Sequence, residues 1–162
     1  MTHKTLDRID LAILRELQAN ARITNAELSR RVNLSPSPCL ERVRRLEERG
    51  YIRGYFAHLN ARRLKTNLVV FIEINLERTA PGVFADFKAA AMRIEEIQEC
   101  HLVSGNFDYL IKARVADMEA YRRFLGETVL ELPHVRESRS YVVMETVKET
   151  LSIPLGPRLI ED

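Results

Sequence analysis

The side chains of this chain that are best suited to chemistry are arginines, and they gather in its first third. The run from Glu41 to Gly50 contains four of them, Arg42, Arg44, Arg45 and Arg49. A guanidinium group can bind a phosphate, or the edge of a guanine, through two parallel hydrogen bonds. Such a cluster on one helix indicates recognition of nucleic acid, if neighbouring elements present that helix correctly.

Two helix starts are predicted directly before this run. Thr24 is a favourable N-cap and Glu27 completes a capping box with it, so a helix is expected to begin at Asn25. Ser35 and Pro36 suit the cap and the first position of the next helix. The turn between the two helices is short. The pattern therefore predicts a helix-turn-helix, which places its second helix in the DNA major groove.

The second helix is predicted to be amphipathic. Its apolar side carries Cys39, Leu40, Val43 and Leu46, and across from it lie Arg42, Arg45 and Arg49. An isolated charged run is more often the solvated face of a bundle helix. Three features favour DNA here: the length of the turn, the amphipathic helix expected from Asp7 to Asn20, and the charge of the whole region.

That charge is divided unevenly along the chain. Residues 1–65 hold 14 lysines and arginines against 7 acidic residues, and residues 66–162 hold 11 against 16. The net charge of +2 therefore combines a half at +7 with a half at −5. This asymmetry is expected when one domain meets phosphates and the other does not.

Length and composition set further bounds. With 162 residues, 46% of them hydrophobic, the chain can form one ordinary core or two small ones, and the change of charge favours two. No stretch approaches the roughly 18 apolar residues of a membrane span, and no signal region begins the chain, so we expect a soluble cytoplasmic protein. Cys39 and Cys100 fit no disulfide or metal pattern and are expected to be reduced core residues.

The second half alternates between strand and helix patterns. A short strand or wing is expected at 51–59, and the first long strand follows from Leu68 to Leu76. Apolar residues then recur at helical spacing from Val83 to Ile94, after Pro81.

The remaining predicted elements are two strands, a helix and a final strand. Strand-like runs at 97–103 and 107–115 are joined by Ser104-Gly105-Asn106, expected to be a tight hairpin turn. A helix capped by Asp117 and reaching Leu132 precedes a long strand at 135–147. The order βαββαβ predicts an α+β chain in which a ferredoxin-like domain follows the helix-turn-helix.

Four segments carry a resemblance to a known family. They are Leu6-Asp7-Arg8-Ile9-Asp10, the run 34–46, the run 99–110, and Ser140-Tyr141-Val142-Val143-Met144-Glu145. Over nearly its whole length the chain resembles the Lrp/AsnC regulators. The resemblance implies an N-terminal winged helix-turn-helix domain and a C-terminal ACT-like domain that senses an amino acid and dimerises through its sheet. It further implies that dimers assemble into octamers or larger particles.

The expected domains follow from these patterns. Residues 1–59 form the DNA-binding domain, 60–66 a linker, and 67–150 the effector-sensing and oligomerisation domain. The tail 151–162 departs from the family pattern and is either disordered or involved in assembly.

The expected DNA contacts fall into two groups. Because the first residues of a recognition helix usually reach base edges, the groove-facing group is Ser37, Pro38, Glu41, Arg42 and Arg45. Arg30, Arg31, Arg44 and Arg49 are expected to hold phosphates, and Asn25 and Ser35 complete the set. A symmetric dimer then predicts a partly palindromic DNA site with half-sites about one helical turn apart.

The resemblance places an amino acid near the 104–106 hairpin, where dimers meet. The residues expected around it are Leu102, Ser104, Gly105, Asn106, Asp108, Met118, Tyr141, Val142 and Val143. Backbone N–H groups of the turn can bind a carboxylate, Asp108 can pair with an ammonium, and the apolar side chains favour leucine, alanine or methionine. Taken singly, each residue is more often a core or turn residue. No other cofactor is expected.

Three positions differ from the family pattern. Asn33 replaces glycine in the turn, which is conformationally mild because asparagine tolerates the left-handed region. Ser37 replaces threonine, and the lost methyl group affects a possible thymine contact. Asn106 replaces aspartate, which removes a charge beside the sensing loop.

Enzymatic chemistry is not indicated. The four histidines, His3, His58, His101 and His134, are scattered, and no metal-ligand spacing, phosphate loop or nucleophile elbow occurs. The sequence therefore predicts a bacterial, nucleoid-associated transcription factor, acting as activator or repressor of amino-acid metabolism genes. Two alternatives are a nonspecific DNA-compacting protein and a stand-alone amino-acid-binding module, which would respectively ignore amino acids and ignore DNA.

Overall fold

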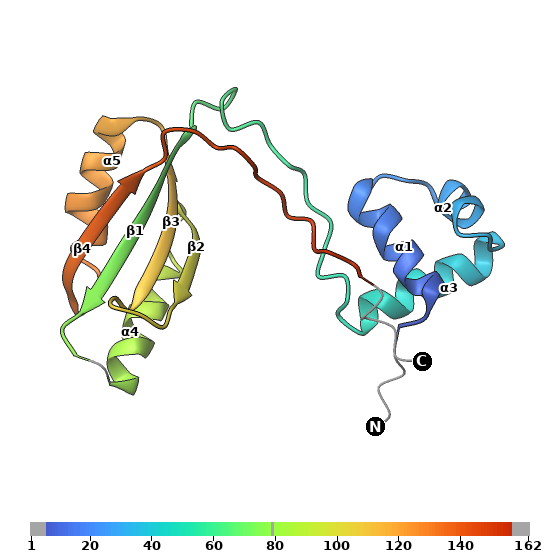
Figure 1. The fold of residues 1–162 in the computed structure, drawn as a ribbon, viewed down its shortest axis with the longest axis horizontal. Helices are drawn as coiled ribbons and strands as arrows, with labels where there is room; N and C mark the ends of the chain where they lie inside the picture. The colour runs from blue at the N-terminus through green and yellow to red at the C-terminus, as the bar shows by residue number, and fades with distance from the viewer. Residues whose placement is uncertain (1–5, 79, 157–162) are drawn as a thin grey trace. The chain divides into compact units, whose positions relative to one another are not determined.

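The computed structural model describes residues 6–78 and 80–156. The chain forms two compact units (Figure 1). Residues up to His58, together with those from Glu149 onward, make the helical unit, and Leu59–Lys148 make the second unit. Residues 1–5 of the expected first domain and 157–162 of the expected tail lie outside the described residues.

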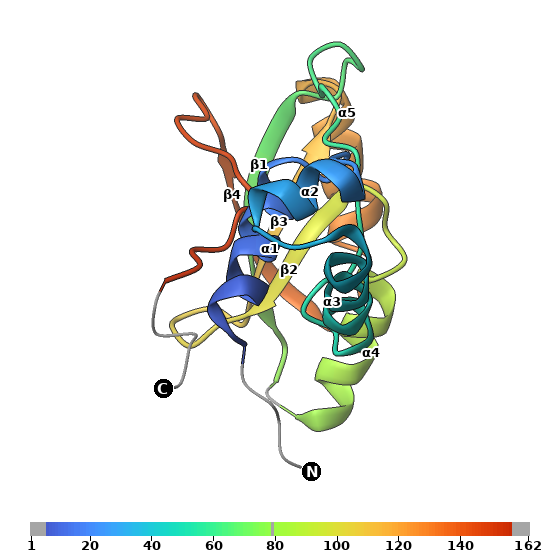
Figure 2. The ribbon, with the colours of Figure 1, turned by 90° about the vertical axis from the view of Figure 1, so that its right-hand side faces the viewer.

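The helical unit contains α1 (Arg8–Ala19), α2 (Asn25–Arg31) and α3 (Pro36–Glu48) among its described residues (Figure 2). The α1 helix begins at a capping box between Asp7 and Asp10, in which each carboxylate accepts a hydrogen bond from the backbone N–H of the other. Buried apolar side chains from all three helices form one core: Leu6, Leu11, Ile13, Leu28, Val32, Cys39 and Leu46. The three predicted helices are therefore confirmed.

Two of the predicted caps differ in detail. The Thr24 hydroxyl accepts from the N–H of Glu27 at 3.2 Å, but the Glu27 carboxylate pairs with arginines of its own helix instead of completing a box. Ser35 caps α3 without a side-chain hydrogen bond. The reason is that Pro38 occupies the third helical position, where it has no N–H to donate to the Ser35 oxygen.

The segment after α3 forms no strand within the described chain, so the wing expected at 51–59 is not formed here. Its backbone has no neighbouring strand with which to pair. The hydroxyl of Tyr55 donates to the Glu47 carboxylate at 2.8 Å, which attaches the segment to α3.

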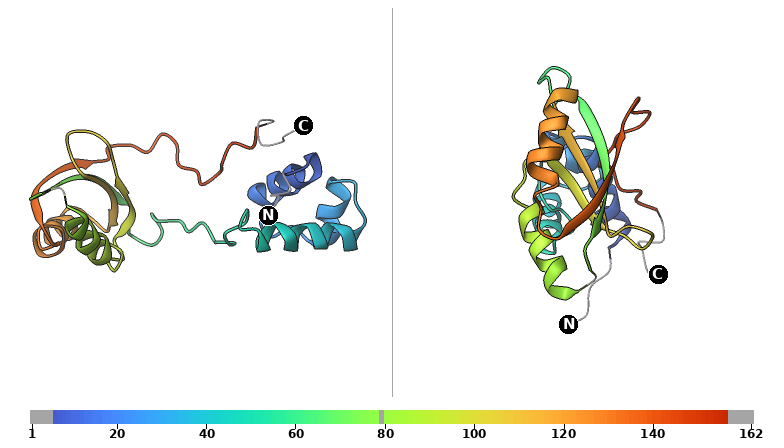
Figure 3. Two further views of the ribbon diagram at one scale, coloured as in Figure 1. Left: turned by 90° about the horizontal axis from the view of Figure 1, so that it is seen from below. Right: turned by 90° about the vertical axis from the view of Figure 1, so that its left-hand side faces the viewer.

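The second unit has the predicted order βαββαβ. Its elements are β1 (Leu68–Leu76), α4 (Pro81–Ala91), β2 (Ile97–Leu102), β3 (Tyr109–Val115), α5 (Met118–Phe124), the π-helical turn η1 (Leu125–Val129) and β4 (Val135–Val142). In the part of the unit that the structure describes, the strands form one antiparallel sheet in the order β2-β3-β1-β4. Both helices pack on one face of the sheet (Figure 3). The ferredoxin-like fold is therefore confirmed.

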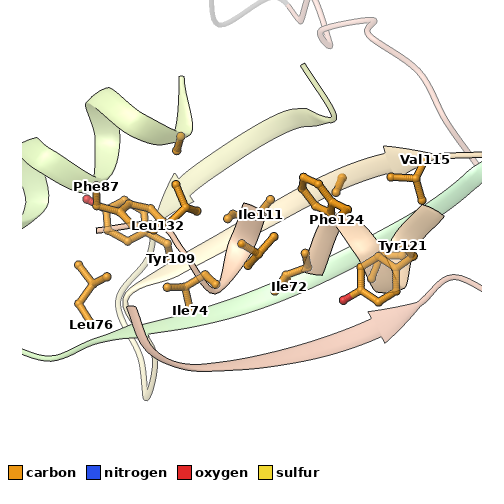
Figure 4. Close-up of a cluster of buried hydrophobic side chains, with 14 of the residues drawn as sticks. Ile72, Ile74, Leu76, Phe87, Tyr109, Ile111, Val115, Tyr121, Phe124 and Leu132 are labelled. Carbon is orange, nitrogen blue, oxygen red and sulfur yellow. The ribbon is translucent and has the colours of Figure 1, made fainter. Parts of the chain in front are cut away.

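The core lies between that face and the helices (Figure 4). Alternate residues of β1 and β3 point into it, and the rings of Phe87 and Tyr109 stack at 4.4 Å between centroids. The other face carries Phe71 beside Tyr141 and Lys112, and Glu73 beside Leu110. Neither of the two α-helices described in this unit covers this second face, which we call the open face of the sheet (Figure 3).

Three boundary predictions are wrong. A loop at 103–108 joins β2 to β3 in place of a tight turn, and Gly105 does not need a left-handed backbone there. The α5 helix ends at Phe124 and continues only as η1. The β4 strand ends at Val142, because β1, the strand it pairs with, begins at Leu68 and offers little further backbone.

The two cysteines have different surroundings. Cys39 is buried as predicted, whereas Cys100 is exposed because β2 is an edge strand of the sheet. Both are free thiols, and burial around each raises its pKa. The prediction that both are core residues is thus correct only for Cys39.

Candidate DNA-binding and effector sites

The outward side of α3 is formed by exposed residues of its first turns and by the next residues on the same face of the helix. Ser37, Pro38, Glu41 and Arg44 are exposed there. Leu40, which was expected on the apolar side of the helix, is 39% exposed, so that expectation is wrong. Residues three or four apart are neighbours on a helix, so Ser37, Glu41 and Arg44 form one continuous surface.

Two arginines predicted to face the groove instead bind acids of α1. Arg42 Nη1 donates to Asp7 Oδ2 at 2.6 Å and to Asp10 Oδ1 at 2.8 Å. Arg45 Nη2 donates to Asp10 Oδ1 at 3.2 Å. Asp10 is only 3% exposed, so a buried carboxylate is neutralised by two guanidinium groups. We call these four residues the Asp10 cluster.

The sequence analysis missed the two acids of this cluster. The available signal was an aspartate at the cap of α1 and another three residues later, which a capping box explains without any arginine. Only the packing of α1 on α3 reveals their second partners.

The charges in the Asp10 cluster stabilise one another. Burial acts to raise the pKa of Asp7, but hydrogen bonds from Arg42 and from the backbone of Asp10, with the charge of Arg42, lower that pKa below its usual 3.8. The hydrogen bond to Asp7 likewise raises the pKa of Arg42. Both groups are therefore charged at neutral pH.

The remaining predicted DNA contacts differ in how they are held. Arg30 and Arg31 pair with Glu27, and Arg31 also reaches Glu16 at 2.8 Å. The Asn25 side chain donates to the Pro36 carbonyl at 2.8 Å and so joins the starts of α2 and α3.

Arg44 and Arg49 are both exposed near the end of α3. Arg44 makes no ion pair with any residue that the structure describes. Its guanidinium group is thus available to a partner.

The predicted effector residues form two groups at opposite ends of the sheet. Leu102 and the 103–108 loop lie at the end of β1, where Ile74 pairs with Tyr109 (Figure 1). Val142 pairs with Val70, near the start of β1. On β1, Val70 pairs with Val142 and Leu76 donates its N–H to Asp108, and these two positions lie about 20 Å apart at the usual rise of about 3.3 Å per residue. One chain therefore does not bring the two groups together.

The loop group is organised by Asp108. Its Oδ2 accepts a hydrogen bond from the backbone N–H of Leu76 at 2.8 Å, and its own N–H donates to Ile74 at 2.9 Å. The carbonyl of Asp108 accepts from Val103 at 3.0 Å, which closes the loop. The backbone and Oδ2 of Asp108 thus hold the loop in place, and Oδ1 is the oxygen left for an ammonium group. Ser104, Gly105 and Asn106 are exposed at the tip of the loop.

The other group is more apolar. Met118 begins α5, after the Asp117 cap whose carboxylate accepts from Ala120 N–H at 2.8 Å. Met118 and Tyr141 are exposed, and Val142 and Val143 are at the end of β4. These apolar residues come from two elements, the start of α5 and the end of β4.

A pocket of about 390 Å³ lies elsewhere in this unit, lined in part by Thr66, Arg114 and Phe124. None of the predicted effector residues lines it. No group of three potential metal-ligating side chains occurs among the described residues. None of the helices described is long and apolar enough to cross a membrane.

Both halves of the chain match known families. A model of the Lrp/AsnC ligand binding domain matches residues 69–153, and a model of winged helix-turn-helix DNA-binding domains matches residues 6–53. The leucine-responsive regulatory proteins of Salmonella typhimurium and of Escherichia coli K12 are each 63% identical to the chain over 155 residues, covering 96% of this chain and 94% of the relative.

Solved structures agree with these matches. A transcriptional regulator from Neisseria meningitidis in complex with L-methionine is similar with a TM-score of 0.90 at 40% identity, covering 96% of this chain and 100% of that one. A feast or famine regulatory protein from M. tuberculosis complexed with L-methionine has a TM-score of 0.83 at 34% identity, covering 91% of this chain and 98% of that one.

Proposed function

Because the chain belongs to the Lrp/AsnC family of transcriptional regulators, we propose that it is an oligomeric switch in which leucine or methionine changes how pairs of α3 helices bind DNA. Membership makes it a DNA-binding regulator that responds to an amino acid, and not an enzyme. The identity of the effector, the contact residues and the assembly are the parts we propose.

For DNA binding, the outward face of α3 meets the major groove. Ser37, Pro38 and Glu41 face base edges there, and Arg44 holds a phosphate. Arg42 and Arg45 are 24% and 34% exposed in their side chains. Each guanidinium has five N–H groups, so donors beyond those bound to Asp10 can reach the DNA. In this arrangement α1 sets the direction of both arginines.

For effector binding, two copies of the chain are required. The 103–108 loop of one copy meets Met118 and the end of β4 of another, because within one chain Asp108 lies beside Leu76 whereas Val142 lies beside Val70, about 20 Å away along β1. The separation across the sheet is the observation that carries this part of the proposal. Asp108 Oδ1 would receive the ammonium group, exposed loop N–H groups the carboxylate, and the apolar surface the side chain.

The choice between effectors rests on chemistry and on the relatives. The curated relatives are named leucine-responsive, and the two solved structures described above contain L-methionine. Leucine and methionine have aliphatic side chains of similar size, which suit Leu102, Met118 and Val143.

The open face of the sheet is the proposed dimer interface. It is broad and continuous with the exposed end of β4, and dimerisation there would present two α3 helices to one DNA site. We propose that dimers assemble further into octamers or larger particles, and that the protein acts on the bacterial nucleoid in the cytoplasm.

The test is selection of bound fragments from total genomic DNA at physiological salt, with and without leucine, alanine or methionine. Enrichment of a few promoters that changes with one amino acid supports the proposal. Unselective recovery with a steep salt dependence would favour a DNA-compacting protein. Amino-acid binding without DNA recovery would favour a stand-alone sensing module.

A further inference from the structure

The segment that follows β4 returns to α1 in the helical unit, to which residues from Glu149 onward belong (Figure 3). The side-chain amide of Gln18 accepts a hydrogen bond from the N–H of Ile153 at 2.8 Å and donates one to its carbonyl at 2.9 Å. Arg15 Nη2 donates to the carbonyl of Leu155 at 2.7 Å. We call residues 149–156 the strap.

The spacing on the two sides explains why these groups meet. Arg15 and Gln18 are three residues apart on α1 and so share one face of the helix. Ile153 and Leu155 are two residues apart in an extended segment, so their carbonyls point to the same side. The Gln18 amide takes the place of a peptide group in a neighbouring strand, since it exchanges both hydrogen bonds with one residue. Pro154 favours the extended conformation of Ile153 that this exchange needs.

The docked strap is recognised by its backbone. Leu151 is 85% and Ile153 67% exposed, so neither side chain is buried by docking. Leu155 is half-buried, and three hydrogen bonds at an exposed surface with so little apolar burial hold a segment only marginally. A small change elsewhere in the chain is therefore enough to shift the strap between docked and released states.

The strap also has a direct covalent connection to the effector residues. Tyr141 and Val142 end β4, and the chain runs from Val143 to Glu149 into the strap. We propose that the strap couples the two domains: binding of the effector at the end of β4 changes how often the strap is docked on Arg15 and Gln18, and this alters DNA binding. The inference rests on the proposed function, since it assumes an effector at that end of the sheet.

The experiment uses the full chain with the Gln18→Ala and Arg15→Ala substitutions. Arg22→Ala is the matched control, because Arg22 is an exposed arginine of the same unit whose side chain does not contact the strap. Amide hydrogen exchange of Ile153, whose N–H is bonded to Gln18, measures docking. In Gln18→Ala it should become about tenfold faster, as expected when about 1.4 kcal/mol of local stability is lost.

The second measurement is the ratio of DNA dissociation constants with and without the amino acid, on a fragment selected from genomic DNA. We expect this ratio to fall at least about threefold in both strap variants and to be retained in Arg22→Ala. Unchanged exchange in Gln18→Ala overturns the docking. Faster exchange with an unchanged ratio overturns the coupling.

Failure of the proposed function would look different. In that case the wild-type ratio itself is close to one for every amino acid, while the exchange data still report whether Gln18 holds the strap. Thermal melting of each variant shows that it is folded, and Arg15→Ala carries the same test if Gln18→Ala unfolds.

Discussion

At the scale of single residues, Asp10 is the most constrained side chain of the DNA-binding unit. It completes the capping box of α1 and at the same time binds Arg42 and Arg45 of α3. A carboxylate with these partners is stable in a buried position, and its removal takes away the acidic partner of Arg45 and leaves Arg42 with Asp7. Asp10 therefore connects the stability of the unit to the direction of its recognition helix.

Asp10→Asn should lower the free energy of unfolding by about 2 kcal/mol, less than for a fully buried pair because both arginines reach solvent. The control is Glu48→Gln, an equivalent loss of charge at an exposed site of α3, which should change stability by less than about 0.5 kcal/mol. Urea unfolding of both variants measures the difference. Equal effects would show that the Asp10 cluster contributes no more than a surface charge.

Asp7→Asn tests the pH dependence of the same cluster. Asparagine retains the cap, so the substitution removes only the charge that faces Arg42. Because the pKa of Asp7 is lowered by folding, its contribution is complete above pH 3.8 and disappears as the pH falls through the lower folded value. Asp7 is half exposed, so the wild type should be more stable by less than about 1 kcal/mol at pH 7.

That difference should vanish once the pH falls below the lowered folded pKa of Asp7, as unfolding curves at several acidic pH values would reveal. A difference that persists unchanged in acid would mean that the hydrogen bond geometry, and not the charge, is responsible.

At the scale of elements, apolar periodicity together with caps and turn residues predicted the α-helices and strands that the structure describes, and it also predicted a wing at 51–59 that does not form. Ends were harder to predict. The length of β4 depends on where its neighbour β1 begins, and the cap of α3 depends on Pro38 lacking an N–H. Likewise, the sequence indicated the arginines of α3 as a group, but not their ion pairs with Asp7 and Asp10. Those pairs depend on how α1 packs against α3, which a local sequence pattern does not reveal.

Arg44→Ala tests the outward face of α3. If Arg44 holds a phosphate, DNA affinity should fall similarly for all sequences, and the slope of log K against log salt should decrease by about 1. Arg93→Ala, an exposed arginine of the other unit, is the control and should leave both quantities unchanged. Relaxed base preference at one position would instead place Arg44 against a base edge.

At the scale of the whole molecule, the separation of the effector residues makes sensing a property of the assembly. Asp108 lies at one end of the sheet, and Met118 with Tyr141 at the other. The sequence resemblance names both groups but not their separation, which follows from the register of β1 with β3 and β4. A lone chain offers two incomplete halves of a site.

Mixed oligomers provide the test. Asp108→Asn and Tyr141→Ala should each abolish the effect of the amino acid on DNA binding when present alone. When the two variants are co-assembled in equal amounts, about a quarter of all sites should have both halves intact, because each site draws its two halves from different copies. A mixture of Asp108→Asn with Leu102→Ala, whose substitutions lie in the same half of the site, should contain no intact site. No recovery in either mixture would place the site within one chain, since every chain then carries a lesion.

The strap has a further consequence for how the protein is made. Arg15 and Leu155 are separated by 140 positions, yet they contact each other within one compact unit. On the ribosome, α1 emerges early, and its partner emerges only after the whole sheet domain has been translated. The three helices can thus fold first, but the contact of α1 with Leu155 must wait until 140 further residues have been synthesised.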